Sequence, residues 1–369
     1  MNYTIIDSLA VLTAILLLIF SVFAFTYKKG NTTSHKILGA FLFANALYII
    51  DFALMAIIDA TNIDLRWFSG IGTSFGFLFG PLLFFYTESI TQKEFSVKPY
   101  DLFHLIVFII FFGDSLIKIR IPFLYLYIVL YVQTTPYMIA SFLLIFNYRE
   151  TIKNYFSSID KLSLTWMLYV VGAFFVMWMV DLTDFILSNL KLIGNLAGVY
   201  LVFISLMINF LFAILIFYKA LQHPEILAGI TEIEKPPKYE QSRLTETEKT
   251  EYLQKINGYF ETQKPYLNPE LKITEVAKQL NVSVKYLSQV INESLGKNFY
   301  DFINSYRIEE AKRQLINEID SKKTVLEVLY ESGFNSKSAF NSAFKKHTGF
   351  TPTEFRKQPL INWNFGKKS

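Results

Sequence analysis

Among the aspartates that lie inside otherwise apolar stretches of the chain, three could form a site: Asp51 in one stretch, and Asp181 and Asp184 in another. An ionised carboxylate is costly there unless water, a partner group or a ligand compensates its charge. Asp181 and Asp184 are one helical turn apart and would share a face, and neither stretch contains a Lys or Arg to pair with them. Two interpretations stay open. The carboxylates reach water near a surface, or they form a polar pocket that receives a cation, a polar ligand or a proton as a signal.

Other groups typical of catalysis or metal binding are scarce. The 369 residues include no Cys, and the 4 His residues are scattered without ligand spacing. The lack of Cys excludes disulfides, thiolate metal sites and cysteine nucleophiles. A Gly-rich phosphate loop and a nucleophile elbow are also missing from the sequence. We therefore predict that the protein is not an enzyme and uses no cofactor.

A second set of polar residues lies near the C-terminal end, in two stretches with helical spacing. Ser283 and Ser336 each precede an amphipathic pattern and would cap a helix. Leu287 in the first stretch and Phe340 in the second lie on the apolar face of their helix. The two stretches superpose at one constant offset, which indicates an internal repeat.

Each of these helices follows a shorter one. In the first pair the shorter helix ends near Asn281, which tolerates the left-handed conformation. In the second pair it begins with a capping box of Thr324 and Glu327 and ends at Gly333. Each pair predicts a helix-turn-helix unit, and a helix over residues 299–315 would join the two units. Such spacing would let both second helices enter successive major grooves of DNA.

Short motifs occur along this region in a fixed order: Lys264-Pro265-Tyr266-Leu267-Asn268-Pro269, Tyr286-Leu287-Ser288, Arg307-Ile308-Glu309-Glu310-Ala311, Gly333-Phe334, Phe344-Lys345-Lys346, Gly349-Phe350-Thr351-Pro352 and Phe355-Arg356. In this order they resemble the DNA-binding domain of the AraC family of bacterial transcription regulators. The resemblance extends over about a quarter of the chain and does not include the first 220 residues. It implies a domain with two helix-turn-helix units that binds double-stranded DNA.

The resemblance also implies which side chains face the DNA. The residues that would face bases are Lys285, Ser288 and Gln289 in the first unit and Lys337, Ser338, Asn341 and Ser342 in the second. Amide side chains suit adenine, and lysine suits guanine. The residues that would contact phosphates are Lys345, Lys346 and Arg356. For any one of these positions, the alternative is a solvated surface residue without a role.

The part of the chain before Gln222 is much more apolar, in a protein that is 52% hydrophobic overall. Seven apolar segments there are each near the roughly 20 residues that span a bilayer as a helix. They are residues 5–27, 37–58, 67–87, 101–117, 123–146, 162–187 and 193–221. In the third segment Gly72, Gly76 and Gly80 recur one turn apart, which would let another helix approach closely. That helix would belong to the same chain or to a second subunit.

The orientation of the chain in the membrane is predicted from the Lys and Arg residues of the short loops, because loops rich in them favour the cytoplasmic side. Loops one, three and five hold Lys28, Lys29, Lys36, Lys93, Lys98, Arg149, Lys153 and Lys161. Loops two, four and six hold fewer: Arg66, Lys118, Arg120 and Lys191. We therefore predict an N-terminus outside and a C-terminal domain in the cytoplasm, at the inner membrane of a bacterium.

The prediction is an all-α protein: a polytopic bundle of about seven transmembrane helices, then a cytoplasmic domain of the AraC type. The expected domains are a transmembrane sensor (1–221), a linker (222–244), the DNA-binding domain (245–358) and a short tail (359–369). The function would be that of a membrane-bound transcription regulator. Its partners would be double-stranded DNA, the lipid bilayer and an unknown small-molecule or ionic signal, with RNA polymerase and a second copy of the chain left open. The alternative is a membrane receptor or transporter subunit whose C-terminal domain docks proteins.

Overall fold

The computed structural model describes residues 3–28, 32–61, 70–92, 95–117, 121–160, 162, 164–222, 244–317 and 323–357. Apart from Gln222 and Leu244, the predicted linker lies outside these residues, as does the predicted tail. Within them the regular structure is helical, and the one extended contact is an isolated antiparallel bridge between Phe156 and Lys272, so the predicted all-α class is confirmed. The chain forms two compact units, one of residues 1–147 and 164–234 and one of residues 148–163 and 235–369.

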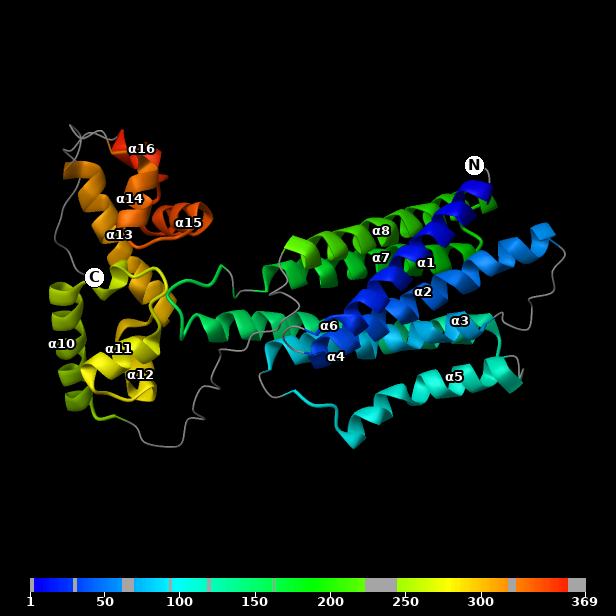
Figure 1. The fold of residues 1–369 in the computed structure, drawn as a ribbon, viewed down its shortest axis with the longest axis horizontal. Coiled ribbons are helices and arrows are strands. Elements are labelled where there is room, and N and C mark those ends of the chain that lie inside the picture. The colour runs from blue at the N-terminus through cyan, green and yellow to red at the C-terminus, as the bar shows by residue number, and fades with distance from the viewer. Residues whose placement is uncertain are drawn as a thin grey trace. The chain divides into compact units, whose positions relative to one another are not determined.

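The first unit consists mainly of long apolar helices (Figure 1). In chain order they are α1 (Tyr3–Thr26), α2 (Thr32–Thr61), α3 (Ile71–Ser74), η1 (Phe75–Leu78), α4 (Phe79–Thr91), η2 (Pro99–Leu105), α5 (Ile106–Ile117), α6 (Phe123–Ile152), α7 (Thr165–Asn189) and α8 (Asn195–Gln222). Among the described residues, six segments are long and apolar enough to cross a membrane: α1, α2, η2 with α5, α6, α7 and α8. They coincide with all the predicted spans except the third.

The third predicted span is a run of three shorter helical pieces, α3, η1 and α4, and its first residues lie outside the described ones. Its glycines meet other helices of the same chain. A Cβ atom added to Gly72 would lie 2.3 Å from the carbonyl oxygen of Leu47 in α2, and one added to Gly80 would lie 2.7 Å from the ring of Tyr137 in α6. The small residues therefore let neighbouring helices pack against backbone. Of the two partners left open by the sequence, the structure shows the neighbour in the same chain.

The second unit contains α10 (Glu246–Gln263), η3 (Pro265–Leu267), α11 (Ile273–Leu280), α12 (Val284–Leu295), α13 (Phe299–Asn317), α14 (Val325–Glu331), α15 (Lys337–Thr348) and α16 (Pro352–Arg356). It has two hydrophobic cores. One is built around α10, α11 and α12, the other around α14, α15 and α16. Helix α13 contributes Phe302 and Ile303 to the first core and Ile308 and Leu315 to the second. It is therefore the element that holds the two halves together.

Candidate functional site

The turns of both helix pairs have the expected local structure. Ser283 caps α12 by accepting a hydrogen bond from the backbone N–H of Tyr286, and Ser336 caps α15 in the same way from Ala339. Asn281 and Gly333 adopt left-handed conformations, with φ of 53° and 89°. Such residues reverse the chain between two helices at little cost.

Helix α15 presents the polar residues that the sequence placed there. Its inner face is buried through Phe340, Ala343 and Phe344. Its exposed residues include Lys337, Ser338, Asn341, Ser342 and the nearby Lys345 and Lys346. The Lys346 ammonium lies 2.9 Å from a carboxylate oxygen of Asp301, whereas Arg356 is half-buried at the end of α16. One exposed face of α15 therefore combines groups suited to base edges with groups suited to phosphates.

Helix α12 differs from this expectation. Ser288 and Gln289 are only 5% and 8% exposed, so their predicted place on the solvent side is wrong. Gln289 donates a hydrogen bond to Glu293, and Lys285 is half-buried. The contact of these residues with bases stays a prediction.

The packing of α10 accounts for the buried Gln289. Gln289 shares a helical face with Tyr286 and Glu293, and both of these contact α10. The Tyr286 ring stacks on Tyr252 with centroids 6.4 Å apart, and Lys249 lies 2.8 Å from Glu293. The sequence pattern of α12 alone did not reveal a neighbour on this face.

Comparison with known proteins concerns the same region. Residues 276–358 match a family model described as a helix-turn-helix domain. This region is a helix-turn-helix domain of the AraC type. An uncharacterised HTH-type transcriptional regulator of Staphylococcus aureus is 31% identical over 30% of this chain. Another, of Pseudoalteromonas carrageenovora, is 37% identical over 25% of it. The chain spans only 14% and 52% of these two relatives. The C-terminal domain of AraT, a response regulator of Geobacillus stearothermophilus, is 28% identical, with a TM-score of 0.27 over 34% of this chain and 97% of that one.

At the centre of the second unit, the helix-turn-helix domain contains a buried arginine. Arg307 in α13 is 1% exposed. Its guanidinium donates to the carbonyl oxygens of Tyr266 at 2.8 Å, Asn268 at 2.8 Å and Ser157 at 2.9 Å, and to the Ser157 hydroxyl at 3.0 Å. It also lies over the Phe334 ring of the second half. Burial lowers the pKa of Arg307 to about 10, so it remains charged at neutral pH.

The segment between α6 and α7 is part of the same unit. The backbone N–H of Ser157 donates to Leu271 O at 3.1 Å, and that of Ile273 donates to Tyr155 O at 3.0 Å. These bonds flank the bridge between Phe156 and Lys272 and fix the segment beside the first residues of α11. In the sequence, this segment is recognisable only as a basic loop. An arginine inside the apolar pattern of α13 was the available signal, because Arg is rarely buried without partners.

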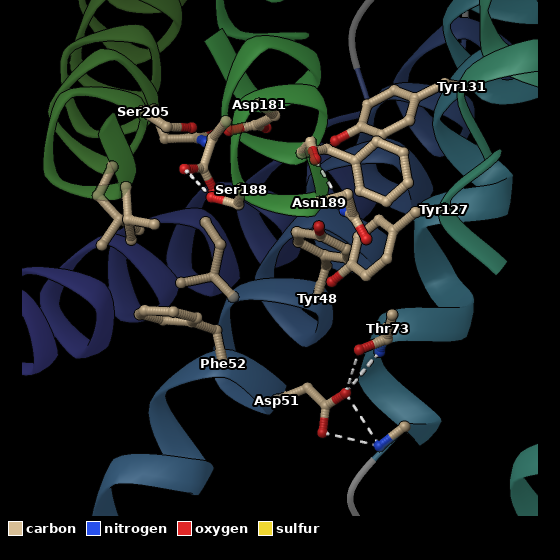
Figure 2. A pocket seen from close by; sticks show the side chains of 17 residues that line it. Tyr48, Asp51, Phe52, Thr73, Tyr127, Tyr131, Asp181, Ser188, Asn189 and Ser205 are labelled. Atoms are coloured by element: carbon tan, nitrogen blue, oxygen red, sulfur yellow. Dashed lines mark hydrogen bonds between the residues drawn. The ribbon is translucent and has the colours of Figure 1, made fainter. Parts of the chain in front are cut away.

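In the first unit the three aspartates of the sequence analysis line one cavity of about 400 Å³. Figure 2 shows Asp51 on one side of it and Asp181 on the other. Its walls come from α2, α3, α6, α7 and α8. The structure thus brings together carboxylates that are distant in the sequence, and their role as a signal pocket stays a prediction.

Asp51 has a structural role within this cavity. Its carboxylate accepts hydrogen bonds from the backbone N–H groups of Gly70 at 3.1 Å and Thr73 at 2.8 Å, and from the Thr73 hydroxyl (Figure 2). These N–H groups belong to the start of α3, where backbone donors have no partner in the helix and a negative charge is favourable. Asp51 is 4% exposed, and its charge is compensated by these donors.

Asp181 and Asp184 have weaker partners. Ser205 forms a side-chain hydrogen bond with Asp181, and Ser188 donates one to Asp184 at 3.2 Å. A neutral hydroxyl does not neutralise a carboxylate. Among the described residues, no Lys, Arg or His lines the cavity. These two acids are therefore the better candidates for a binding role.

Proposed function

We propose that the chain is a membrane-bound transcription regulator that binds double-stranded DNA through its helix-turn-helix domain. The exposed polar face of α15, capped by Ser336 and anchored by a buried apolar face, is the observation that supports DNA binding most directly. The relatives named as HTH-type transcriptional regulators support the same function. The signal enters at the cavity of the first unit.

The salt dependence of binding separates this function from protein docking. A DNA complex releases counterions, so its affinity falls steeply as salt rises, whereas an apolar docking surface does not respond in this way. We expect full-length protein in detergent micelles to bind selected duplexes and to lose at least about a hundredfold in affinity between about 50 and 200 mM salt. Fluorescence anisotropy with labelled duplexes measures this. A flat salt response would support the docking module.

Two substitutions in α15 should have different effects on DNA binding. Asn341→Ala removes an amide suited to adenine and should cost about 1–3 kcal/mol on the preferred sequence only. Lys345→Ala removes a phosphate contact, so it should weaken binding on all sequences and reduce the salt slope by about 1. Anisotropy titrations on preferred and scrambled duplexes compare the two variants. Equal losses on both duplexes for Asn341→Ala would contradict its role as a base contact.

The proposed membrane topology has the N-terminus outside and the helix-turn-helix domain in the cytoplasm. Reporter fusions after Lys29, Asp64, Lys93, Arg120, Lys161 and Lys191 should alternate in, out, in, out, in, out, because the basic loops are retained inside. All of these positions except Lys191 lie outside the described residues. A cytoplasmic signal at Asp64 would show that the second helix does not cross as proposed.

A further inference from the structure

We propose that the cavity of the first unit binds a small organic amine in its ammonium form. This inference rests on the proposed function, because it names the class of signal that the sensor would receive. Four properties of the cavity carry it: uncompensated negative charge, a buried acceptor without a partner, aromatic walls and a suitable volume.

The charge of the cavity favours a cation. Asp51 is satisfied by the start of α3, as described above. Asp181 and Asp184 lie one turn apart on α7 with only hydroxyl partners, and the described lining adds no positive side chain. A ligand with a positive charge would offset the cost of holding these two carboxylates together.

A buried amide in the same cavity has an oxygen that could accept a hydrogen bond from a ligand. Asn209 of α8 is 7% exposed and lines the cavity, and its Oδ1 atom has no hydrogen-bond partner among the described residues. A buried acceptor without a partner is destabilising. An ammonium group carries several N–H donors, so it can serve a carboxylate and Asn209 at once. A quaternary ammonium ion offers no such donor.

The remaining walls suit an organic body. Tyr127, Tyr131 and Phe185 form an aromatic corner, with the Phe185 ring 5.6 Å and 5.4 Å from the two tyrosine rings. Aromatic faces attract cations, and the apolar residues Ile49 and Leu206 complete the lining. Cavities for small organic ligands are typically about 300–1,000 Å³, and this one is about 400 Å³. Ser188 and Asn189 are exposed, so the cavity reaches the surface near the end of α7.

The test uses full-length protein in lipid nanodiscs without DNA. Four amines (butylamine, diaminobutane, phenylethylamine and tyramine) are each compared with the alcohol in which hydroxyl replaces the amine. Isothermal titration calorimetry measures binding. We expect saturable binding of at least one amine and at least tenfold weaker binding of its alcohol. If no amine binds, or if amine and alcohol bind equally, the inference is overturned without the need for any variant.

Variants then locate the site. Asp184→Asn and Asp181→Asn preserve shape and remove charge, and we expect each to weaken amine binding at least tenfold. Asn209→Leu removes the acceptor and should weaken it several-fold. Asp7→Asn, which changes an acid of α1 outside this cavity, is the matched control and should bind like the parent. Unchanged binding in both α7 variants overturns the proposal.

The same preparation separates this inference from the proposed function. Anisotropy with labelled duplexes is measured without amine. Protein that binds DNA but discriminates no amine from its alcohol refutes the amine site and leaves DNA binding intact. Protein that binds an amine through Asp184 but shows no salt-dependent affinity for DNA supports the site and refutes the regulator.

Discussion

Replacing Arg307 by alanine is expected to destabilise the helix-turn-helix domain by about 3 kcal/mol or more. The guanidinium serves three carbonyl groups and a hydroxyl, and hydrogen bonds to a charged group contribute about 1.5–3 kcal/mol each. Alanine leaves the carbonyl oxygens of Tyr266, Asn268 and Ser157 without these donors. Hydrogen–deuterium exchange of α11 and α13 in the full-length protein measures the loss as faster exchange.

Arg313→Ala provides the matched control on the same helix. The Arg313 side chain is 51% exposed and pairs with Glu310 at 2.9 Å. Exposed ion pairs contribute about 0–1 kcal/mol, so this variant should exchange nearly like the parent. If Arg307→Ala exchanges no faster than Arg313→Ala, the buried hydrogen bonds do not hold the domain together.

Gly333→Ala is expected to have a comparable effect for a different reason. Gly333 is left-handed, and this conformation costs about 1–2 kcal/mol for a residue with a Cβ atom. In addition, that Cβ would lie 2.4 Å from the carbonyl oxygen of Tyr266, which is backbone and cannot turn aside. Together, the two effects should lower the free energy of unfolding by about 3 kcal/mol or more, since overpacking in a core typically adds about 1–3 kcal/mol. Thermal unfolding of the domain in full-length protein measures the change.

Gly349→Ala separates the two causes. Gly349 is also left-handed, with a φ of 80°, but nothing lies within 4 Å of an added Cβ. It should therefore show only the conformational cost of about 1–2 kcal/mol. Equal melting temperatures for the two variants would mean that the contact between Gly333 and Tyr266 adds no strain.

The helices of this protein could be predicted because their signals are local. Long runs of apolar residues predicted the six long helical segments. Capping residues such as Ser283, Ser336 and Thr324 predicted where α12, α15 and α14 begin. The third predicted span is less regular than expected: it is divided into α3, η1 and α4, and its glycines contact the neighbouring helices α2 and α6, which no local pattern reveals.

The candidate sites depended on contacts that no local pattern contains. The sequence grouped Asp51 with Asp181 and Asp184, yet only the structure shows that the start of α3 already compensates Asp51. The family resemblance implied that Gln289 faces DNA, but α10 packs against that face of α12. Arg307 belonged to a recognised motif, and its partner Ser157 is 150 positions away.

The bond between Ser157 and Arg307 also restricts how the chain can thread through a bilayer. If the first unit spans a bilayer as proposed, a segment bonded to the helix-turn-helix domain must lie on the same side of that bilayer as the domain, so the stretch from 164 to 244 would cross it an even number of times. Helices α7 and α8, which are long and apolar enough to cross a membrane, would provide two such crossings. Whether α3, η1 and α4 together cross or only dip into the bilayer therefore has no bearing on where the DNA-binding end lies relative to this loop. It decides only on which side of the bilayer the first residues of the protein begin.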